Sequence, residues 1–211
     1  MIAITVQIYA EKRSLSSCLA HAKLTKYWVP KEGEEDMTND GKSVRLTGGH
    51  TKALKTANGD TIAKVSDITW SKFQMEGTGL LSSGVMVNLG INNNVFVKLD
   101  RAESPYGLGS QDHINLEPWV SVASNDLEIG TTLYIKELDG VSLPNGRVHN
   151  GCVRVDDKGW DLEYCQIDFF VLQFSAFKEL SKTIPTTVSA TQRSCHVQNY
   201  ITKAVQKWAV I

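Results

Sequence analysis

Residues 149–170 read HNGCVRVDDKGWDLEYCQIDFF, and this stretch decides the fold. It is mostly β-like, yet it carries five carboxylates and two cysteines. One of the acids, Asp168, stands between Ile167 and an apolar run that begins at Phe169. Burying a charge is costly unless the charge is paired or neutralised. Two explanations are open: the strand turns a polar face to solvent, or Asp168 is half-buried and keeps a proton, as a general acid must.

The composition is that of a globular protein of 211 residues, 42% hydrophobic and 21% charged, which argues against disordered and fibrous classes. This length allows one sizeable core, or one domain with a large insertion. The 22 basic and 23 acidic residues nearly cancel, which argues against nucleic acid as a partner and fits a neutral polymer. No apolar run approaches the roughly 18 residues of a membrane span. The start MIAITVQIYAEKRS is predicted to be a strand rather than a signal peptide.

Four cysteines, at positions 18, 152, 165 and 195, form no CxxC pair, and the five histidines are scattered. We therefore expect no metal and no cofactor. Two disulfides of an extracellular protein are one interpretation, and four reduced thiols are the other. Of the three possible pairings we favour Cys152–Cys165 across a turn, with Cys18–Cys195 joining the two ends of the domain.

Short β-like runs separated by Gly, Asn and Asp predict a mainly β fold, a barrel or a sandwich. Helices are predicted at 175–182 and, from apolar residues at steps of three and four, at 195–210. The acidic stretch 31–42 is predicted to be a solvated loop. The predicted strands are AITVQIY (3–9), AKLTKYWV (22–29), SVRLTG (43–48), TIAKVS (61–66), GVMVNLG (84–90), VFVKLD (95–100), WVSVAS (119–124), TTLYIKEL (131–138), CVRVD (152–156) and IDFFVLQF (167–174).

Two late motifs resemble those of a known family. IGTTLYI (129–135) matches a P-L-G-T-x-V-Y-V strand, and DDKG (156–159) with IDFF (167–170) matches D-D-T-G-G-A-I-K-G-x-x-I-D-L-F. The step from Asp157 to Asp168 is the eleven residues of that pattern. Upstream, MEGTGLLSSGVMVNLG (75–90) is similar to an E-G-T-G-x-L-x-D-G stretch. The chain thus resembles the three-aspartate domain of bacterial cell-wall proteins and of membrane-bound lytic transglycosylase A.

This resemblance implies a six-stranded double-psi β-barrel, a fold shared with expansins and family 45 endoglucanases, with inserted β-rich loops and a short helical C-terminal segment. We expect a single domain over 1–211, with a barrel core at about 20–175 that is interrupted by an insertion at about 45–115. The remaining residues, 176–211, would form a helical extension.

The resemblance also implies a site in which Asp168 is the general acid. Asp157 would fix the neighbouring loop or raise the pKa of Asp168, although a turn-capping role is an equal alternative. The T-R-Y-W-D strand of the endoglucanases corresponds to residues 25–29, so Tyr27 and Trp28 would form the floor of a sugar groove. Core packing is the commoner fate of an aromatic residue. Val29 replaces the endoglucanase base.

Inverting glycosidases need two carboxylates, so the missing base favours a lytic transglycosylase, in which the C6 hydroxyl of the substrate attacks the anomeric carbon. Glu76 is a candidate substrate-binding residue, and Glu76 or Asp157 could take the role of the base. Trp160, in a polar loop, is a candidate sugar-stacking residue, and His149 with Asn150 would line the groove or form a surface turn.

Two departures from the family pattern bear on specificity. Its G-G-A-I-K-G loop is rebuilt as GWDLEY, and its first aspartate falls on Ala123 or Ser124. These changes are compatible with a polymer other than peptidoglycan, or with loss of catalysis.

The leading hypothesis is a secreted, monomeric enzyme that cleaves β-1,4 bonds of a cell-wall polysaccharide (peptidoglycan, chitin or β-glucan), with neither a nucleic-acid nor a membrane-spanning role. The alternative is a non-catalytic, expansin-like wall-binding or wall-loosening protein. Only the enzyme would release reducing ends or anhydro-sugars.

Overall fold

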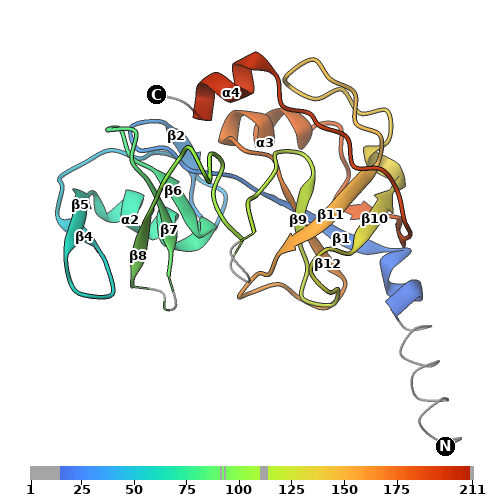
Figure 1. The fold of residues 1–211 in the computed structure, drawn as a ribbon, viewed down its shortest axis with the longest axis horizontal. Helices are drawn as coiled ribbons and strands as arrows, with labels where there is room; N and C mark the ends of the chain where they lie inside the picture. Colours follow the sequence, from blue (N-terminus) through green and yellow to red (C-terminus); the bar gives the residue numbers. More distant parts are fainter. Residues whose placement is uncertain (1–14, 91, 93, 110–113, 210–211) are drawn as a thin grey trace, which may run out of the picture.

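The computed structural model describes residues 15–90, 92, 94–109 and 114–209, so the strand predicted at 3–9 lies outside the described residues. Its main feature is a seven-stranded sheet of order β13-β1-β12-β9-β11-β10-β14 (Figure 1). The strands are β1 (Ala22–Tyr27), β9 (Ser121–Ala123), β10 (Thr132–Ile135), β11 (Cys152–Asp157), β12 (Gln166–Phe170), β13 (Thr187–Val188) and β14 (Ala190–Gln192). The mainly β prediction is therefore confirmed.

The two edge strands of this sheet are successive parts of one segment. β13 pairs with β1, and β14, which starts two residues after β13 ends, pairs with β10. The sheet therefore curls until its edges meet at Ser189, whose carbonyl accepts a hydrogen bond from the Lys136 N–H. The six-stranded double-psi barrel expected from the sequence stays a prediction, since the strand pairing gives seven strands in an open order.

The alternation of side chains explains why β12 lies in the middle of this sheet. Ile167 and Phe169 point to one side and are fully buried in the main apolar cluster. β12 runs parallel to β1 and antiparallel to β9, so both of its neighbours come from distant parts of the sequence. Successive strand residues face opposite sides, which puts Asp168 on the face opposite Ile167 and Phe169.

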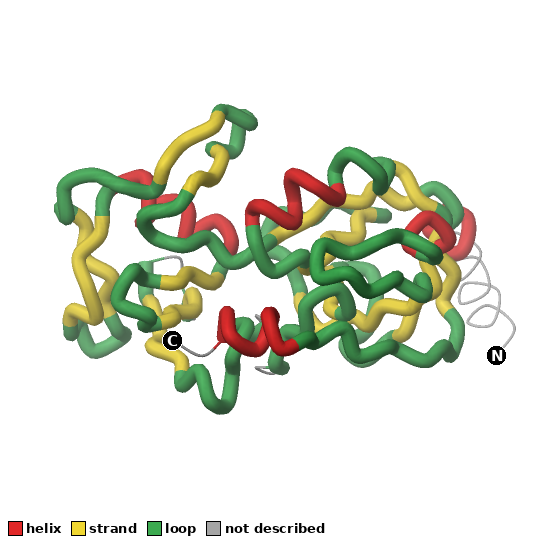
Figure 2. The backbone as a smooth tube through the Cα atoms, turned by 90° about the horizontal axis from the view of Figure 1, so that it is seen from above, coloured by secondary structure: helices red, strands yellow, loops and turns green. Residues whose placement is uncertain are grey.

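A second group of elements surrounds a smaller apolar cluster made of Leu54, Val65, Phe73, Leu81, Val87 and Phe96. The group contains β4 (Lys52–Lys55), β5 (Thr61–Val65), α2 (Asp67–Glu76), β6 (Thr78–Leu80), β7 (Met86–Leu89) and β8 (Phe96–Leu99). Figure 2 shows the elements gathered on two sides, with the C-terminal helix between them. The domain boundaries expected from the sequence stay predictions.

The acidic stretch 31–42 is more ordered than predicted. It contains β2 (Glu35–Met37), which pairs with β3 (Ser43–Arg45), and Asp36 is only 1% exposed. The prediction of a wholly solvated loop is wrong because Asp36 has buried partners, which are described below.

The helices agree in part with the sequence. The helix predicted at 175–182 is α3 (Phe174–Leu180), followed in the chain by the C-terminal helix α4 (Lys203–Ala209). The helix predicted over 195–210 is shorter, because residues 195–202 have no regular secondary structure and are held by the side chains of Asn145 and Asn150. A 3-10 turn, η1 (Lys136–Leu138), follows β10. Among the described residues, no helix has the length and apolar character to span a bilayer.

The four cysteines form two disulfides, Cys18–Cys165 and Cys152–Cys195. The pairing favoured from the sequence is wrong. Cys152 begins β11 in the sheet interior next to the C-terminal segment, whereas Cys165 ends the β11–β12 loop near the start of β1. Each bridge therefore ties a terminal segment to the sheet.

Candidate functional site

Asp168 lies at the centre of β12, opposite Thr25 of β1 on one side and Ala123 of β9 on the other. Asp157, the last residue of β11, is paired with the same Ala123 across an irregularity in the β11–β9 register. Such irregularities redirect side chains. The two aspartates therefore flank β9, with backbones about 10 Å apart at two strand spacings. In the sequence pattern described above, the first of the three aspartates falls on Ala123 or Ser124. These residues lie at the end of β9, the short strand between Asp157 and Asp168.

The Asp168 carboxyl is short of partners. Its Oδ1 atom is buried and has no hydrogen-bond partner among the described residues. Burial, with a smaller contribution from the charges of Glu76 and Asp157, raises the pKa of Asp168 to about 7. A hydrogen bond with the Thr25 hydroxyl and the charge of Lys26 act in the opposite direction. A carboxyl with this pKa can donate a proton near neutral pH.

Glu76 is held in a buried ion-pair network at the end of α2. Its carboxylate accepts from the Lys72 ammonium at 2.6 Å and from the Trp28 N–H at 3.3 Å. Lys72 also lies 3.3 Å from Asp36 and 4.2 Å above the Trp28 ring, and Asp36 accepts from the indole N–H. Burial raises the pKa of Glu76, although Lys72 opposes this shift. The network has one cation for two acids.

The two aromatic residues expected on the floor of a sugar groove are buried. Trp28 is only 4% exposed and lies against the rings of Phe174 and Phe177 of α3. The Trp28 ring is covered by α3, which fits the alternative of core packing, and its contact with a sugar stays a prediction. Tyr27 packs on Phe170 and is also buried. Burial raises the pKa of Tyr27 well above its usual value, and Asp157 beside its hydroxyl adds to this shift.

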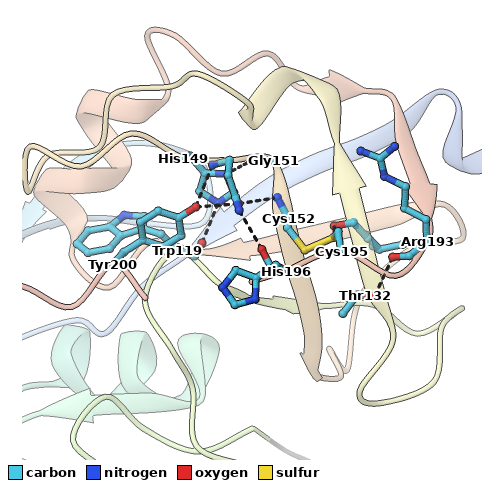
Figure 3. The surroundings of a disulfide bond; sticks show 11 residues. Trp119, Thr132, His149, Gly151, Cys152, Arg193, Cys195, His196 and Tyr200 are labelled. Atoms are coloured by element: carbon cyan, nitrogen blue, oxygen red, sulfur yellow. Dashed lines mark hydrogen bonds between the residues drawn. A yellow bond between two sulfur atoms is a disulfide. The ribbon is translucent and has the colours of Figure 1, made fainter. Parts of the chain in front are cut away.

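His149 is part of the core and does not line the face of Asp168. It is 1% exposed, lies edge-on to Phe169, and stacks on Tyr200 at 5.0 Å (Figure 3). Phe169 points away from the face of Asp168, so His149 lies on the opposite side of the sheet. This burial gives no support to a substrate contact of His149, which stays a prediction.

The ring nitrogens of His149 both have backbone partners. Nδ1 accepts from the Gly151 N–H at 2.8 Å, and Nε2 lies 2.9 Å from the Trp119 carbonyl, to which it donates. Burial lowers the pKa of His149 to about 4. Asn150 binds the C-terminal segment through the Tyr200 hydroxyl and the His196 carbonyl. The pair is thus structural.

Trp160 is 67% exposed in the loop between Asp157 and Asp168, where the sequence placed it. The network residues Lys72 and Asp36, and the neighbours Thr25 and Lys26, were missed. An isolated Lys or Asp has no motif, and only the register of β1 against β12 brings Thr25 to Asp168.

No group of three or more metal-ligating side chains occurs in the part of the chain that the structure describes. Two cavities lie elsewhere. One of about 790 Å³ lies between residues 15–20 and β14, and one of about 330 Å³ lies between β2 and α2. Neither is lined by Asp168.

No protein-family model matches the sequence, and a search of curated proteins gives no significant match. Solved structures do match. MltA of Escherichia coli with bound chitohexaose has a TM-score of 0.52 at 10% identity, over 83% of this chain and 73% of that chain. The membrane-bound lytic murein transglycosylase of Agrobacterium tumefaciens has a TM-score of 0.48 at 10% identity, over 80% and 72%. The chain has an MltA-type lytic transglycosylase fold.

Proposed function

We propose that the chain is an enzyme that cleaves β-1,4-glycosidic bonds of a cell-wall polysaccharide by lytic transglycosylation, with Asp168 as the general acid. The observation that carries this proposal is the Asp168 carboxyl: its Oδ1 atom is buried with no hydrogen-bond partner in the described part of the chain, and its pKa is raised to about 7. A carboxyl held for structural reasons alone would be expected to have its hydrogen bonds satisfied.

One carboxyl is sufficient for this reaction, because Asp168 can act first as the acid and then as the base. Protonated Asp168 gives its proton to the glycosidic oxygen as the bond to the anomeric carbon breaks. The C6 hydroxyl of the same sugar then forms a bond to that carbon and loses its proton to the Asp168 carboxylate. The products are a 1,6-anhydro end and a free 4-hydroxyl, and Asp168 returns to its protonated state.

The neighbours of Asp168 support the single-acid mechanism. Glu76 is held by Lys72 and the Trp28 N–H, which makes it a poor base for activating water. Asp157, one strand beyond Ala123, raises the pKa of Asp168 by its charge and would position the glycan. Val29 is buried, and by the sequence resemblance it stands at the position of the endoglucanase base.

The fold supports the substrate class. The structural neighbours are lytic transglycosylases, and one of them holds chitohexaose, so an aminosugar polymer is the first substrate to test. Two disulfides fit an oxidising compartment, and we infer that the protein works outside the cytoplasm.

The test is mass spectrometry of the soluble products from peptidoglycan, chitin, chitosan and β-glucan, with the wild type and Asp168→Asn. Anhydro-ended fragments that fall by a factor of about 10² to 10⁴ in the variant are expected for the loss of a general acid. Hydrated reducing ends would instead indicate a hydrolase with a second carboxylate. Fragments that persist unchanged in Asp168→Asn would contradict the role of Asp168.

The second candidate is an expansin-like protein that binds polysaccharide without cleaving it. The absence of a base at Val29 fits this function equally well. It predicts that the polymer pulls the protein down while no soluble fragment of any kind appears.

A further inference from the structure

The loop between β11 and β12, residues 158–165, exposes two large aromatic side chains. Trp160 is 67% exposed and Tyr164 is 61% exposed. In Figure 1 this loop runs along the lower edge of the sheet, beside the loop that follows β9. Large aromatic residues are normally well buried, and exposed ones are enriched where a protein binds a partner.

The loop is anchored along its length by the segment after β9. The Asn125 side-chain amide donates to the carbonyls of Gly159 and Leu162, and its oxygen accepts from the Gly159 N–H. The Lys158 ammonium donates to the carbonyls of Ser124 and Leu127. These bonds hold the first half of the loop, and the side chains of Trp160 and Tyr164 take no part in them.

The second half is held by the disulfide. Cys165 is bonded to Cys18, and its N–H donates to the Asp126 carboxylate at 2.8 Å. Its φ of 64° is uncommon for a residue other than glycine and is maintained by these anchors. Leu162 folds over Gly159, where an added Cβ would lie 2.3 Å from the leucine side chain. The loop thus has its own packing, supplied by Leu162.

Rigid aromatic surfaces bind at low entropic cost, because little freedom is lost when the ligand arrives. The loop leaves the sheet directly after Asp157 and returns two residues before Asp168. The two ends of the loop are therefore close in the chain to the two aspartates of the candidate site.

The charges beside the two rings select the ligand. Asp161 lies next to Trp160 and is exposed, and the exposed Glu163, next to Tyr164, is paired with Lys23 at 2.9 Å. Asp157, Asp161 and Glu163 are offset in part by Lys23 and Lys158, which leaves a small excess of negative charge around the rings. This surface therefore disfavours an anionic chain and presents apolar rings to the C–H faces of uncharged sugars.

We propose that Trp160 and Tyr164 form a sugar-stacking site that holds an uncharged β-1,4-linked hexopyranose chain next to Asp168. The site deepens the proposed function and rests on it for the identity of the polymer. It is separate from the chemistry, since neither ring supplies a proton.

The test is calorimetric titration of chitohexaose and cellohexaose into Asp168→Asn, which removes turnover, and into the same background with Trp160→Ala, Tyr164→Ala or both. Each single change is expected to weaken binding roughly three- to tenfold, the size of one aromatic contact. The control is Val97→Ala, which removes another exposed apolar side chain, on β8, away from the loop. Thermal unfolding should be unchanged in all variants, because the replaced side chains are exposed.

Carboxymethylated cellohexaose tests the charge argument. It should bind more weakly than cellohexaose at low salt, and the gap should narrow as salt screens the acids. Equal affinities with and without the two rings, or no binding of either neutral hexamer, would overturn the proposal. Ring-dependent binding in a wild type that yields no fragments would leave the stacking site standing and remove the transglycosylase.

Discussion

At the scale of single residues, Asp168 should cost stability as well as serve chemistry. Burial holds the pKa of Asp168 near 7 in the folded chain, against about 4 for an exposed aspartate. Between these pKa values the folded state binds more protons than the unfolded state. The stability of the fold with a protonated Asp168 is therefore fully present below pH 4, and it is lost as pH rises to 7.

Replacing Asp168 with Asn should therefore stabilise the protein at pH 8, by up to about 4 kcal/mol, and have little effect at pH 4. Urea unfolding of both proteins at the two pH values measures this. Asp161→Asn is the matched control, because Asp161 is exposed and is not among the charges that shift the pKa of Asp168. A difference between wild type and Asp168→Asn that does not grow with pH would show that Asp168 is ionised and hydrated in the folded state.

His149 should have the opposite pH dependence. Its pKa is lowered to about 4 by burial, against about 6.5 unfolded. The unfolded state therefore gains protons first as pH falls, and the stability from neutral His149 is lost between pH 6.5 and 4. The loss from this residue should approach about 3 kcal/mol.

The variant His149→Gln keeps one acceptor for Gly151 and one donor for Trp119, but it cannot titrate. We expect it to lose less stability than the wild type between pH 7 and 4, as measured by urea unfolding. His196 is an exposed histidine next to Cys195 of the Cys152–Cys195 disulfide (Figure 3), and His196→Gln provides the control. Parallel stability curves for His149→Gln and wild type would contradict the prediction.

At the scale of elements, the two disulfides should differ in their contribution. Cys18–Cys165 closes a separation of 147 residues and Cys152–Cys195 one of 43. In the chain-entropy view the longer loop constrains the unfolded state more, by about 1 kcal/mol. The double variant Cys18→Ser, Cys165→Ser should therefore be less stable than Cys152→Ser, Cys195→Ser in urea unfolding under non-reducing conditions. The reverse order would mean that native packing around Cys152 outweighs chain entropy.

The elements also show what the sequence predicts and what it does not. β1, β7 and β12 were found because short apolar runs lie between turn residues. α2 was missed because its buried positions, Thr69, Lys72 and Phe73, are mostly polar and give no apolar stripe. Its one sequence signal was the N-cap, Ser66, which accepts from the Thr69 N–H.

The sequence predicts the site residues that are marked by their spacing or by their local context, but not those whose surroundings come from distant parts of the chain. The eleven-residue step marked Asp157 and Asp168, and the polar context of Trp160 indicated its exposure. Burial of Trp28 and His149 depends on α3 and on the C-terminal segment, which reach them from distant positions in the sequence. No periodicity carries that information.

At the scale of the whole molecule, two apolar clusters are joined by one buried network. Trp28 belongs to the larger cluster, whereas Lys72 and Glu76 are on α2, whose Phe73 lies in the smaller one. The C-terminal helix packs on the larger cluster, where the Trp208 ring stacks on Tyr106 and the Trp208 carbonyl accepts from Arg101. Lys72 is the cation of the buried network and is 3% exposed.

Removing that cation should weaken the junction and change how it responds to pH. In Lys72→Met the carboxylates of Asp36 and Glu76 stay buried without their ammonium partner, which should cost about 3–5 kcal/mol. Lys72 also opposes the upward shift of the Glu76 pKa, so Glu76 should take up a proton more readily in the variant. The deficit measured by urea unfolding should therefore be smaller at pH 5 than at pH 8. Lys64→Met, at an exposed position of β5, should change stability by less than about 0.5 kcal/mol. A deficit in Lys72→Met as small as that, or one that is independent of pH, would mean that water reaches the network and that the two clusters are joined by packing alone.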